Sequence, residues 1–311
     1  MFGKKRARDG PCPSNDGGSY VGQLFQRCGG VARNHADAIA RLGCESVLIS
    51  AVGEDDHGDY LRQQCSHIDI SGVVSISNAS TATYMSMNQK GNVRYGVSSI
   101  GKVLSLITPE MITQKEKVIG TADFLLLDSN LSVETMKKAI EIGSYYKRKI
   151  WVEPTDIKKM NRVFKTGLVR QITATSPNAN EFRMWAQECG VQTTDKALSS
   201  PETVADFVLG NKVLLQDLSF LVVSLAEKGS VVVSKNEKEE YELRLVPAPV
   251  DSTKVFSVSG AGDSFNSGVM CALASGKTVD EALEVGQICA ALTLQTPLAV
   301  STSITPKILF D

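Results

Sequence analysis

The most informative segment of this chain is residues 257–270, Ser-Val-Ser-Gly-Ala-Gly-Asp-Ser-Phe-Asn-Ser-Gly-Val-Met. A β-branched segment leads into it, and apolar residues recur at helical spacing after Gly260, so it predicts a small-residue turn that opens a helix. The first N–H groups of a helix lack intrahelical acceptors, and the helix dipole is positive there. Glycines at 260 and 262 would let an anion approach this backbone closely, so the stretch predicts an anion pocket.

Asp263 falls in the first turn of this predicted helix, next to the anion pocket. A carboxylate there could accept the proton of a hydroxyl group that attacks a phosphoryl group. An aspartate in a first turn also suits the helix dipole, and glycines also serve tight turns. The motif alone therefore leaves a purely structural interpretation open beside the catalytic one.

A second motif, Gly29-Gly30-Val31-Ala32-Arg33-Asn34, lies upstream and opens a predicted helix over residues 31–42. Together, in this order, the two motifs resemble the two signatures of the ribokinase-like (PfkB) carbohydrate and nucleoside kinases. The resemblance runs from about residue 22 to residue 309, and the wording of the upstream motif is most similar to the pseudouridine kinase branch. Within the upstream motif's helix, we interpret His35 as a packing residue.

The resemblance implies roles for residues in both motifs. Asp263 would act as the catalytic base, while the amides of Gly260, Ala261 and Gly262 would stabilise charge on the transferred phosphoryl group. The substrate's sugar hydroxyls would be held by Gly29, Gly30 and Asn34.

The resemblance also implies a nucleotide site. Its expected ATP-binding residues are Asn178, Ser224, Gly229, Gly260 and Gly262, and Glu181 would support Mg²⁺, largely through water. Asn178 and Glu181 equally predict a capping box at a helix start, and both interpretations can hold together. Ala226 stands where the family usually has glycine. Ser257 stands where aspartate is common, so the use of a monovalent cation such as K⁺ is left open.

The beginning of the chain departs from the family pattern. Family members start with a β-strand that ends in an aspartate-bearing turn, but no apolar β-run precedes Gly29. Residues 1–20 are rich in Gly, Ser, Pro and charge, which predicts a disordered segment. We therefore expect a missing first strand and a short lid around residues 73–98, with a hairpin formed by residues 81–88 and 93–98. Serines near residues 97–100 replace an acidic residue that is usual in pseudouridine kinases.

The rest of the chain predicts one α/β kinase domain, residues 21–311, with a central, mostly parallel sheet, helices on both faces and a small β lid. Residues 124–127 are all apolar and are expected to be buried on both faces of the sheet. The polar residues that follow two strands, Asp128, Asn130 and Glu153, are candidates to line a ligand crevice, although turns and caps explain them equally well.

Composition limits the class of protein. The formal net charge is −1, so the chain carries no basic footprint for nucleic acid. Seven cysteines are scattered without C-x-x-C pairs, which predicts reduced thiols in a cytoplasmic protein. No apolar run approaches the ~20 residues that span a membrane. The expected partners are therefore small molecules, with a homodimer left open.

The function that the resemblance implies is ATP-dependent phosphorylation of a primary hydroxyl on a ribose-type substrate, with pseudouridine first among the candidates. One alternative is another kinase of the same fold, of ribokinase or adenosine type. The other is a catalytically impaired nucleotide-binding isoform, which the missing first strand would favour.

Overall fold

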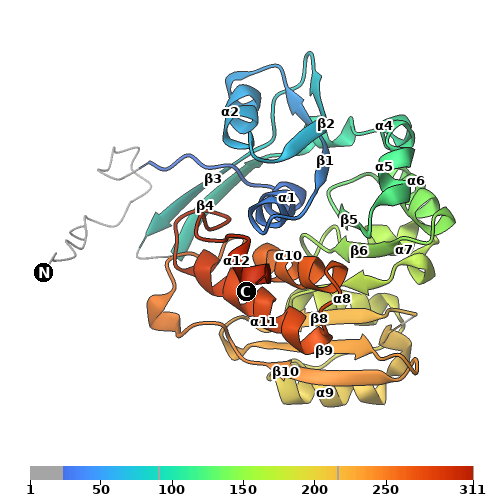
Figure 1. The fold of residues 1–311 in the computed structure, drawn as a ribbon. Helices are drawn as coiled ribbons and strands as arrows, with labels where there is room; N and C mark the ends of the chain where they lie inside the picture. Colours follow the sequence, from blue (N-terminus) through green and yellow to red (C-terminus); the bar gives the residue numbers. More distant parts are fainter. Residues whose placement is uncertain (1–23, 90–91, 216, 311) are drawn as a thin grey trace, which may run out of the picture.

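The computed structural model describes residues 24–310 apart from residues 90, 91 and 216. It has an α/β architecture in which a twisted sheet is covered by helices on both faces (Figure 1). The predicted disordered segment, residues 1–20, lies outside the described residues, as does part of the predicted hairpin turn.

The main sheet has six strands in the order β10-β9-β8-β7-β6-β5. Their bounds are β5 Phe124–Asp128, β6 Lys149–Glu153, β7 Ala174–Thr175, β8 Phe220–Ser224, β9 Ser230–Lys235 and β10 Tyr241–Val246. Strands β5 to β8 pair parallel with one another, whereas β9 pairs antiparallel with both β8 and β10. The mostly parallel sheet is therefore confirmed, and the carboxyl ends of β5, β6, β7 and β8 meet at one edge.

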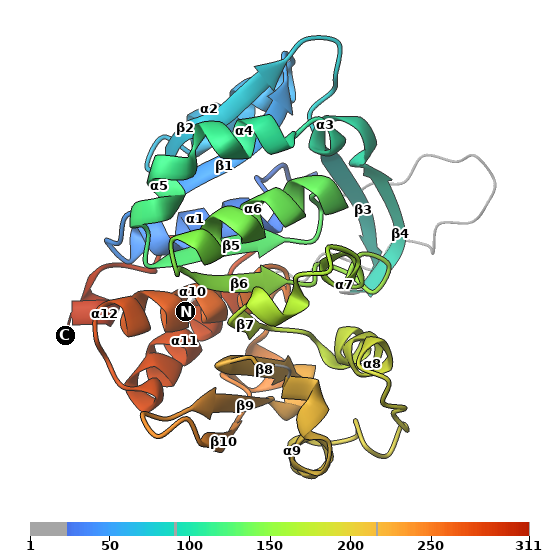
Figure 2. The same ribbon diagram turned by 90° about the vertical axis from the view of Figure 1, so that its right-hand side faces the viewer.

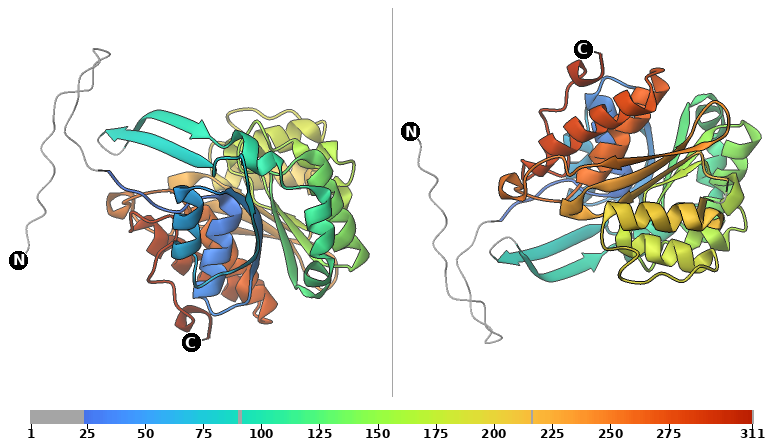
Figure 3. Two further views of the ribbon diagram at one scale, coloured as in Figure 1. Left: turned by 90° about the horizontal axis from the view of Figure 1, so that it is seen from above. Right: turned by 90° about the horizontal axis from the view of Figure 1, so that it is seen from below.

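Alternating apolar residues along the strands create two cores, one on each face of the sheet. In β8, Phe220 and Val222 face one core while Leu221 and Val223 face the other. Figure 3 shows the C-terminal helices and helices α8 and α9 on opposite sides of the sheet. The first core is covered by α1 Val31–Arg41, α10 Ala261–Ala274, α11 Val279–Leu294 and α12 Lys307–Phe310. The second is covered by α4 Pro109–Gln114, α5 Glu116–Thr121, α6 Val133–Tyr145, α7 Arg162–Lys165, α8 Ala179–Glu188 and α9 Pro201–Gly210.

Helices α10 and α11 approach closely because glycines face each other across their contact. A Cβ built on Gly268 would lie 2.9 Å from the Cα of Gly286, so neither position leaves room for a side chain. This close packing holds α10 and α11 side by side (Figure 2). A hydrogen bond from Asn266 to Glu153 ties the first turns of α10 to the carboxyl end of β6.

Two smaller sheets complete the fold. β1 Val47–Gly53 and β2 Asp69–Ile76 form a two-stranded parallel sheet, connected by α2 Asp56–Gln64. β3 Thr83–Gln89 and β4 Asn92–Ser99 form the predicted antiparallel hairpin, which leads to the short helix α3 Gly101–Ser105. The hairpin is shorter than the lid predicted around residues 73–98, because residues 73–76 belong to β2.

The expectation of a missing first strand concerns the chain before Gly29, most of which lies outside the described residues. Residues 24–30 form neither a helix nor a strand. In the described part of the chain, β5 pairs with β6 alone and β1 pairs with β2 alone, so the sheet is divided between β1 and β5.

The prediction that residues 124–127 are buried on both faces was wrong for one face. Leu125 and Leu127 are buried in the core, whereas Phe124 and Leu126 are half-buried. The physical reason is that β5 is the edge strand of the six-stranded sheet, and this face is covered by α1 only in part.

Three cysteines of the described chain are buried, Cys65, Cys271 and Cys289. Within the described residues, no helix combines the length and the apolar character that crossing a bilayer requires.

Candidate active site

Two glycines stand at the N-terminus of α10. The backbone requires glycine at position 260, whereas a side chain at position 262 would enter open space. Gly260 has a φ of 78°, and a Cβ there would lie 1.8 Å from the carbonyl oxygen of Ala299. Both the left-handed backbone and the close contact exclude other residues. Gly262 is exposed, and a Cβ there would meet nothing within 4 Å. Internal packing therefore does not require Gly262, and its missing side chain leaves the helix N-terminus accessible.

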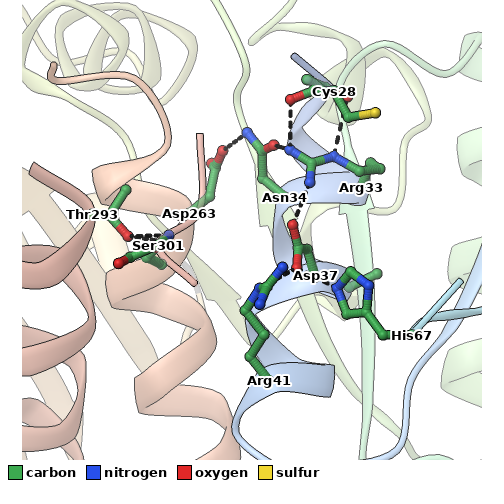
Figure 4. Close-up of polar contacts among 12 residues, drawn as sticks. Cys28, Arg33, Asn34, Asp37, Arg41, His67, Asp263, Thr293 and Ser301 are labelled. Carbon is green, nitrogen blue, oxygen red and sulfur yellow. Dashed lines mark hydrogen bonds and ion pairs between the residues drawn. The ribbon is translucent and has the colours of Figure 1, made fainter. Parts of the chain in front are cut away.

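The loop beneath Gly260 is held by polar contacts from α10 and α11. The Thr293 hydroxyl accepts a hydrogen bond from the Ser301 N–H at 3.3 Å and lies 2.9 Å from the Ser264 hydroxyl (Figure 4). These buried contacts fix the Ala299 carbonyl against the turn. The Ala261 N–H donates to the Val258 carbonyl at 3.4 Å, which tightens the turn. The next amides of α10 have no intrahelical acceptor and are therefore presented by a rigid turn.

Asp263 and Asn34, which lie 229 residues apart, meet between α10 and α1 (Figure 4). The Asn34 side-chain amide donates to Asp263 Oδ2 at 2.6 Å. Arg33 donates to Asn34 Oδ1, which orients the amide group of Asn34 toward Asp263. The structure thus brings together the predicted base and the predicted sugar-binding amide, although these roles stay predictions.

Arg33 is itself held by a buried ion-pair network on α1. It donates to Asp37 Oδ2 at 2.6 Å and to the Cys28 carbonyl at 3.0 Å. Asp37 also pairs with Arg41 at 2.7 Å and with His67 at 2.6 Å. The Cys28 contact fixes the backbone directly before Gly29 and Gly30, which are both exposed at the N-terminus of α1.

Asp263 lies in a setting that favours its protonated form more than water does. Its side chain is only 17% exposed. Burial raises the pKa of the Asp263 carboxyl above its ordinary value, and the negative charge of Glu153 adds to this, while His35 and Asn34 oppose it. A carboxyl whose pKa is raised toward neutrality is a better proton acceptor than an ordinary aspartate.

Glu153, at the end of β6, connects the two halves of the site. Its Oε1 accepts hydrogen bonds from Asn266 on α10 at 2.8 Å and from the Ser176 hydroxyl at 2.6 Å. The buried His35 lies between Glu153 and Asp263 and bonds to the Ser267 hydroxyl. The carboxyl end of β6 therefore lies beside α1 and α10, and its place in a ligand crevice stays a prediction. His35 is buried as predicted, but its neighbours are polar.

The predicted nucleotide residues lie where β8 meets the start of α8. Asn178 and Ser224 form a parallel β-bridge, and the Ser224 N–H donates to the Pro177 carbonyl at 3.0 Å. The Asn178 side chain caps α8, and Glu181 accepts the Asn178 N–H at 2.9 Å, so the capping box is present. The alternative structural interpretation of these two residues is confirmed, and the ligand-binding one stays a prediction.

Glu181 is a buried carboxyl beside other carboxylates. Burial raises the pKa of Glu181 to about 7, and the negative charges of Glu153 and Asp156 add to this. In the described part of the chain, no group of three or more His, Cys, Asp or Glu side chains could hold a metal ion directly, so the support of Mg²⁺ by Glu181 through water stays a prediction. Gly229 has a φ of 96°, and a Cβ there would lie 2.3 Å from the carbonyl oxygen of Val246. The turn itself therefore requires glycine at this position.

Ala226 has a φ of 53°, in the left-handed region that favours glycine. This residue starts the 3₁₀ turn Ala226–Lys228 between β8 and β9. Ala226 therefore keeps the backbone conformation that favours glycine, and alanine adopts it at a conformational cost.

Two further strand-end residues have structural partners. Asp128 accepts the Ala32 N–H at the start of α1, at 3.3 Å, and Asn130 accepts from Lys159 at 2.7 Å. The sequence interpretation missed Asn266 and Ser267, which contact the site. The signal was their spacing, three and four residues after Asp263 on one face of the helix.

Comparison with known proteins agrees with this arrangement. A sequence model described as pfkB family carbohydrate kinase matches residues 5–306. A pseudouridine kinase from Arabidopsis thaliana is 24% identical over 314 residues, which cover 87% of this chain and 82% of the relative. A ribokinase from Haemophilus influenzae is 25% identical, with 91% of this chain and 87% of the relative covered.

The solved structure of Arabidopsis thaliana ribokinase complexed with ribose and ATP has the same fold. It superposes with a TM-score of 0.76 at 20% identity and covers 96% of this chain and 92% of its own. At this identity it supports the ribokinase-like fold alone. Because the family match spans nearly the whole sequence, the chain belongs to the pfkB family of carbohydrate kinases.

Proposed function

We propose that this protein transfers the γ-phosphoryl group of ATP to a primary hydroxyl of a ribose-type substrate, and that the substrate is pseudouridine. The observation that carries the proposal is the 2.6 Å contact between Asp263, at the open N-terminus of α10, and Asn34, behind the exposed Gly29-Gly30 turn. In the proposal, Asp263 serves as the proton acceptor, the start of α10 as the anion pocket and Asn34 as the hydroxyl-binding amide.

In the proposed reaction, Asp263 accepts the hydroxyl proton while the hydroxyl oxygen attacks the γ-phosphorus atom. The bond between this phosphorus and the β–γ bridging oxygen breaks, and ADP leaves with that oxygen. The amides of Gly260, Ala261 and Gly262 stabilise the charge on the transferred group. The raised pKa of Asp263 suits the step, because the base must hold the proton once it has been transferred.

The nucleotide would lie against Asn178, Ser224 and Gly229, with its phosphates toward the α10 turn. Mg²⁺ would neutralise charge on these phosphates, held near Glu181 through water. A monovalent cation beside the turn is a further part of the proposal. The local difference there is Ser257, whose hydroxyl accepts the Ser259 N–H at 3.3 Å.

Two kinds of support favour pseudouridine. The upstream motif is most similar to that branch of the family, and the relative from Arabidopsis carries that name. The hairpin also exposes Tyr84 and Met85, at 64% and 67%, which could cover a base rather than a sugar alone. Ribose or adenosine as the substrate is the first alternative.

The second alternative is a nucleotide-binding protein without catalysis. The divided sheet between β1 and β5 favours it, because a strand at that position would help to hold the sugar side of the site. An intact contact between Asn34 and Asp263 argues for the active enzyme.

The test measures ADP release with Mg-ATP and pseudouridine, uridine, ribose or adenosine, in K⁺ and in Na⁺. Asp263→Asn is the matched control, because it keeps the shape of the side chain and removes the base. We expect turnover with pseudouridine that this variant abolishes. Turnover with a different acceptor would refute the substrate, and ATP binding in a calorimeter without any turnover would refute the kinase proposal.

A further inference from the structure

His35 is the most deeply buried titratable group near Asp263. Its side chain is 1% exposed, and its Nε2 atom lies 3.5 Å from Glu153 Oε1 and 3.7 Å from Asp263 Oδ1. Nε2 has no hydrogen-bond partner among the described residues. A buried polar atom without a partner calls for an explanation, and its surroundings supply one.

The proton on the other ring nitrogen, Nδ1, can be assigned from the geometry. Nδ1 lies 2.9 Å from Ser267 Oγ, and this hydroxyl donates its single proton to the Asp263 carbonyl at 2.7 Å. Ser267 therefore accepts from His35, which requires a hydrogen on Nδ1.

The atoms that face Nε2 indicate that this nitrogen also carries a proton. Both neighbouring oxygens belong to carboxylates that already accept hydrogen bonds, Glu153 from Ser176 and Asn266, and Asp263 from Asn34. A lone pair on Nε2 would face two negatively charged acceptors, whereas an N–H there would be attracted to both.

The charged groups around the ring support a cation as well. Asp128 from β5, Glu153 from β6 and Asp263 from α10 act on it with negative charge. Burial by itself would lower the pKa of His35, but these carboxylates outweigh it and raise the pKa above its ordinary value. The positive charge of Arg33, on the same helix, lowers the pKa of Asp263, as the charge of His35 does.

We propose that His35 is held as an imidazolium beneath Asp263, and that its positive charge keeps the Asp263 carboxylate ionised and ready to accept the substrate proton. His35 is thus a positioning residue that acts through the base and does not touch the substrate. The catalytic consequence rests on the proposed function, whereas the charge state of His35 does not.

The charge state is tested directly by following the imidazole nitrogens of the whole protein by NMR as the pH is raised. The chain has three histidines, and single His57→Gln and His67→Gln variants assign the other two. We expect both nitrogens of His35 to remain protonated well above the ordinary histidine pKa of about 6.5. A neutral His35 at pH 7 would overturn the proposal, whether or not the protein proves to be a kinase.

The effect on the base is tested by the pH profile of kcat/KM in His35→Gln, which removes the charge and keeps a hydrogen-bonding group. Activity falls as pH drops through the pKa of Asp263, so loss of the imidazolium moves this acid limb upward, by about 1–3 pH units. His57→Gln, at an exposed position of α2, is the control and keeps the wild-type profile.

A purely structural role would lower kcat/KM equally at all pH values, and that result would overturn the proposal. If His35→Gln fails to fold, the NMR titration of the wild-type protein decides alone. If turnover is present but His35 is neutral, the proposed function stands and this inference fails.

Discussion

Gly260, the N-cap of α10, and Gly262, its second residue, lead to different predictions because their surroundings differ. In Gly260→Ala, the new Cβ would lie 1.8 Å from the Ala299 carbonyl oxygen at a φ of 78°. In Gly262→Ala, the new Cβ would meet nothing within 4 Å. The first substitution should therefore damage the fold, and the second should damage only what approaches the helix N-terminus.

The magnitudes follow from the separate costs. A left-handed backbone costs alanine about 1–2 kcal/mol relative to glycine. Displacing the Ala299 backbone adds about 1–3 kcal/mol, so Gly260→Ala should lose about 2–5 kcal/mol of unfolding free energy. Gly262→Ala should change stability by no more than about 1 kcal/mol, and in the favourable direction, because alanine is the better helix former.

The assay compares urea denaturation with turnover for the two variants. Gly262→Ala should keep or slightly raise the wild-type denaturation midpoint. It should lose about a hundredfold in kcat, because its methyl group displaces the phosphoryl group from the amides. Equal destabilisation by both variants, or full turnover in Gly262→Ala, would refute the assignment of the space at Gly262 to a ligand.

Three further predictions concern single side chains. Asp263→Asn should lower turnover by about 10²–10⁴-fold while ATP binding, measured by calorimetry, remains; comparable turnover would exclude Asp263 as the base. Ala226→Gly should raise the unfolding free energy by about 1 kcal/mol by removing left-handed strain, whereas Ala291→Gly within α11 should lower it by a similar amount; a loss in both would contradict the strain. The pKa of Glu181 is raised to about 7 by burial, so the stabilisation present at low pH is lost as pH rises through that value. Glu181→Gln can keep the capping contact and does not titrate. Its unfolding free energy relative to wild type should therefore rise by about 2 kcal/mol between pH 5 and pH 8. Parallel curves of stability against pH for the two proteins would contradict the burial of the charge.

The sequence predicted the parts of the fold that depend on local patterns. The start of α10 at Ala261 follows from the glycines and the helical spacing. The bridge between Asn178 and Ser224 joins two segments that the family resemblance assigns to one nucleotide site. The hairpin also follows from alternation around a turn. These features need only neighbours in the chain or a known motif.

The sequence could not predict features that depend on which described strand lies at the edge of the sheet. The run Phe124-Leu125-Leu126-Leu127 reads as a doubly buried strand, but the position of β5 at the sheet edge leaves one face half-covered. Burial is decided by neighbours far along the chain, which apolar content does not reveal.

The surroundings of His35 show the same limit at the site. A histidine between asparagine and alanine on an amphipathic helix reads as a packing residue. Its function depends on Glu153 and Asp263, which β6 and α10 bring to within 3.7 Å of it. Charge on a buried group is set by such contacts, and they appear only once the helices are placed on the sheet.

The central claim is phosphoryl transfer at the junction of α1 and α10. Its most direct measurement is phosphorus NMR and mass spectrometry of the product formed from pseudouridine and Mg-ATP by the wild-type chain and by Asp263→Asn. We expect the wild-type chain to form a product with a phosphate on the 5′ oxygen of pseudouridine, and we expect the variant to form none. Product formed equally by both proteins, or no phosphorylated acceptor from a chain that binds ATP, would contradict it.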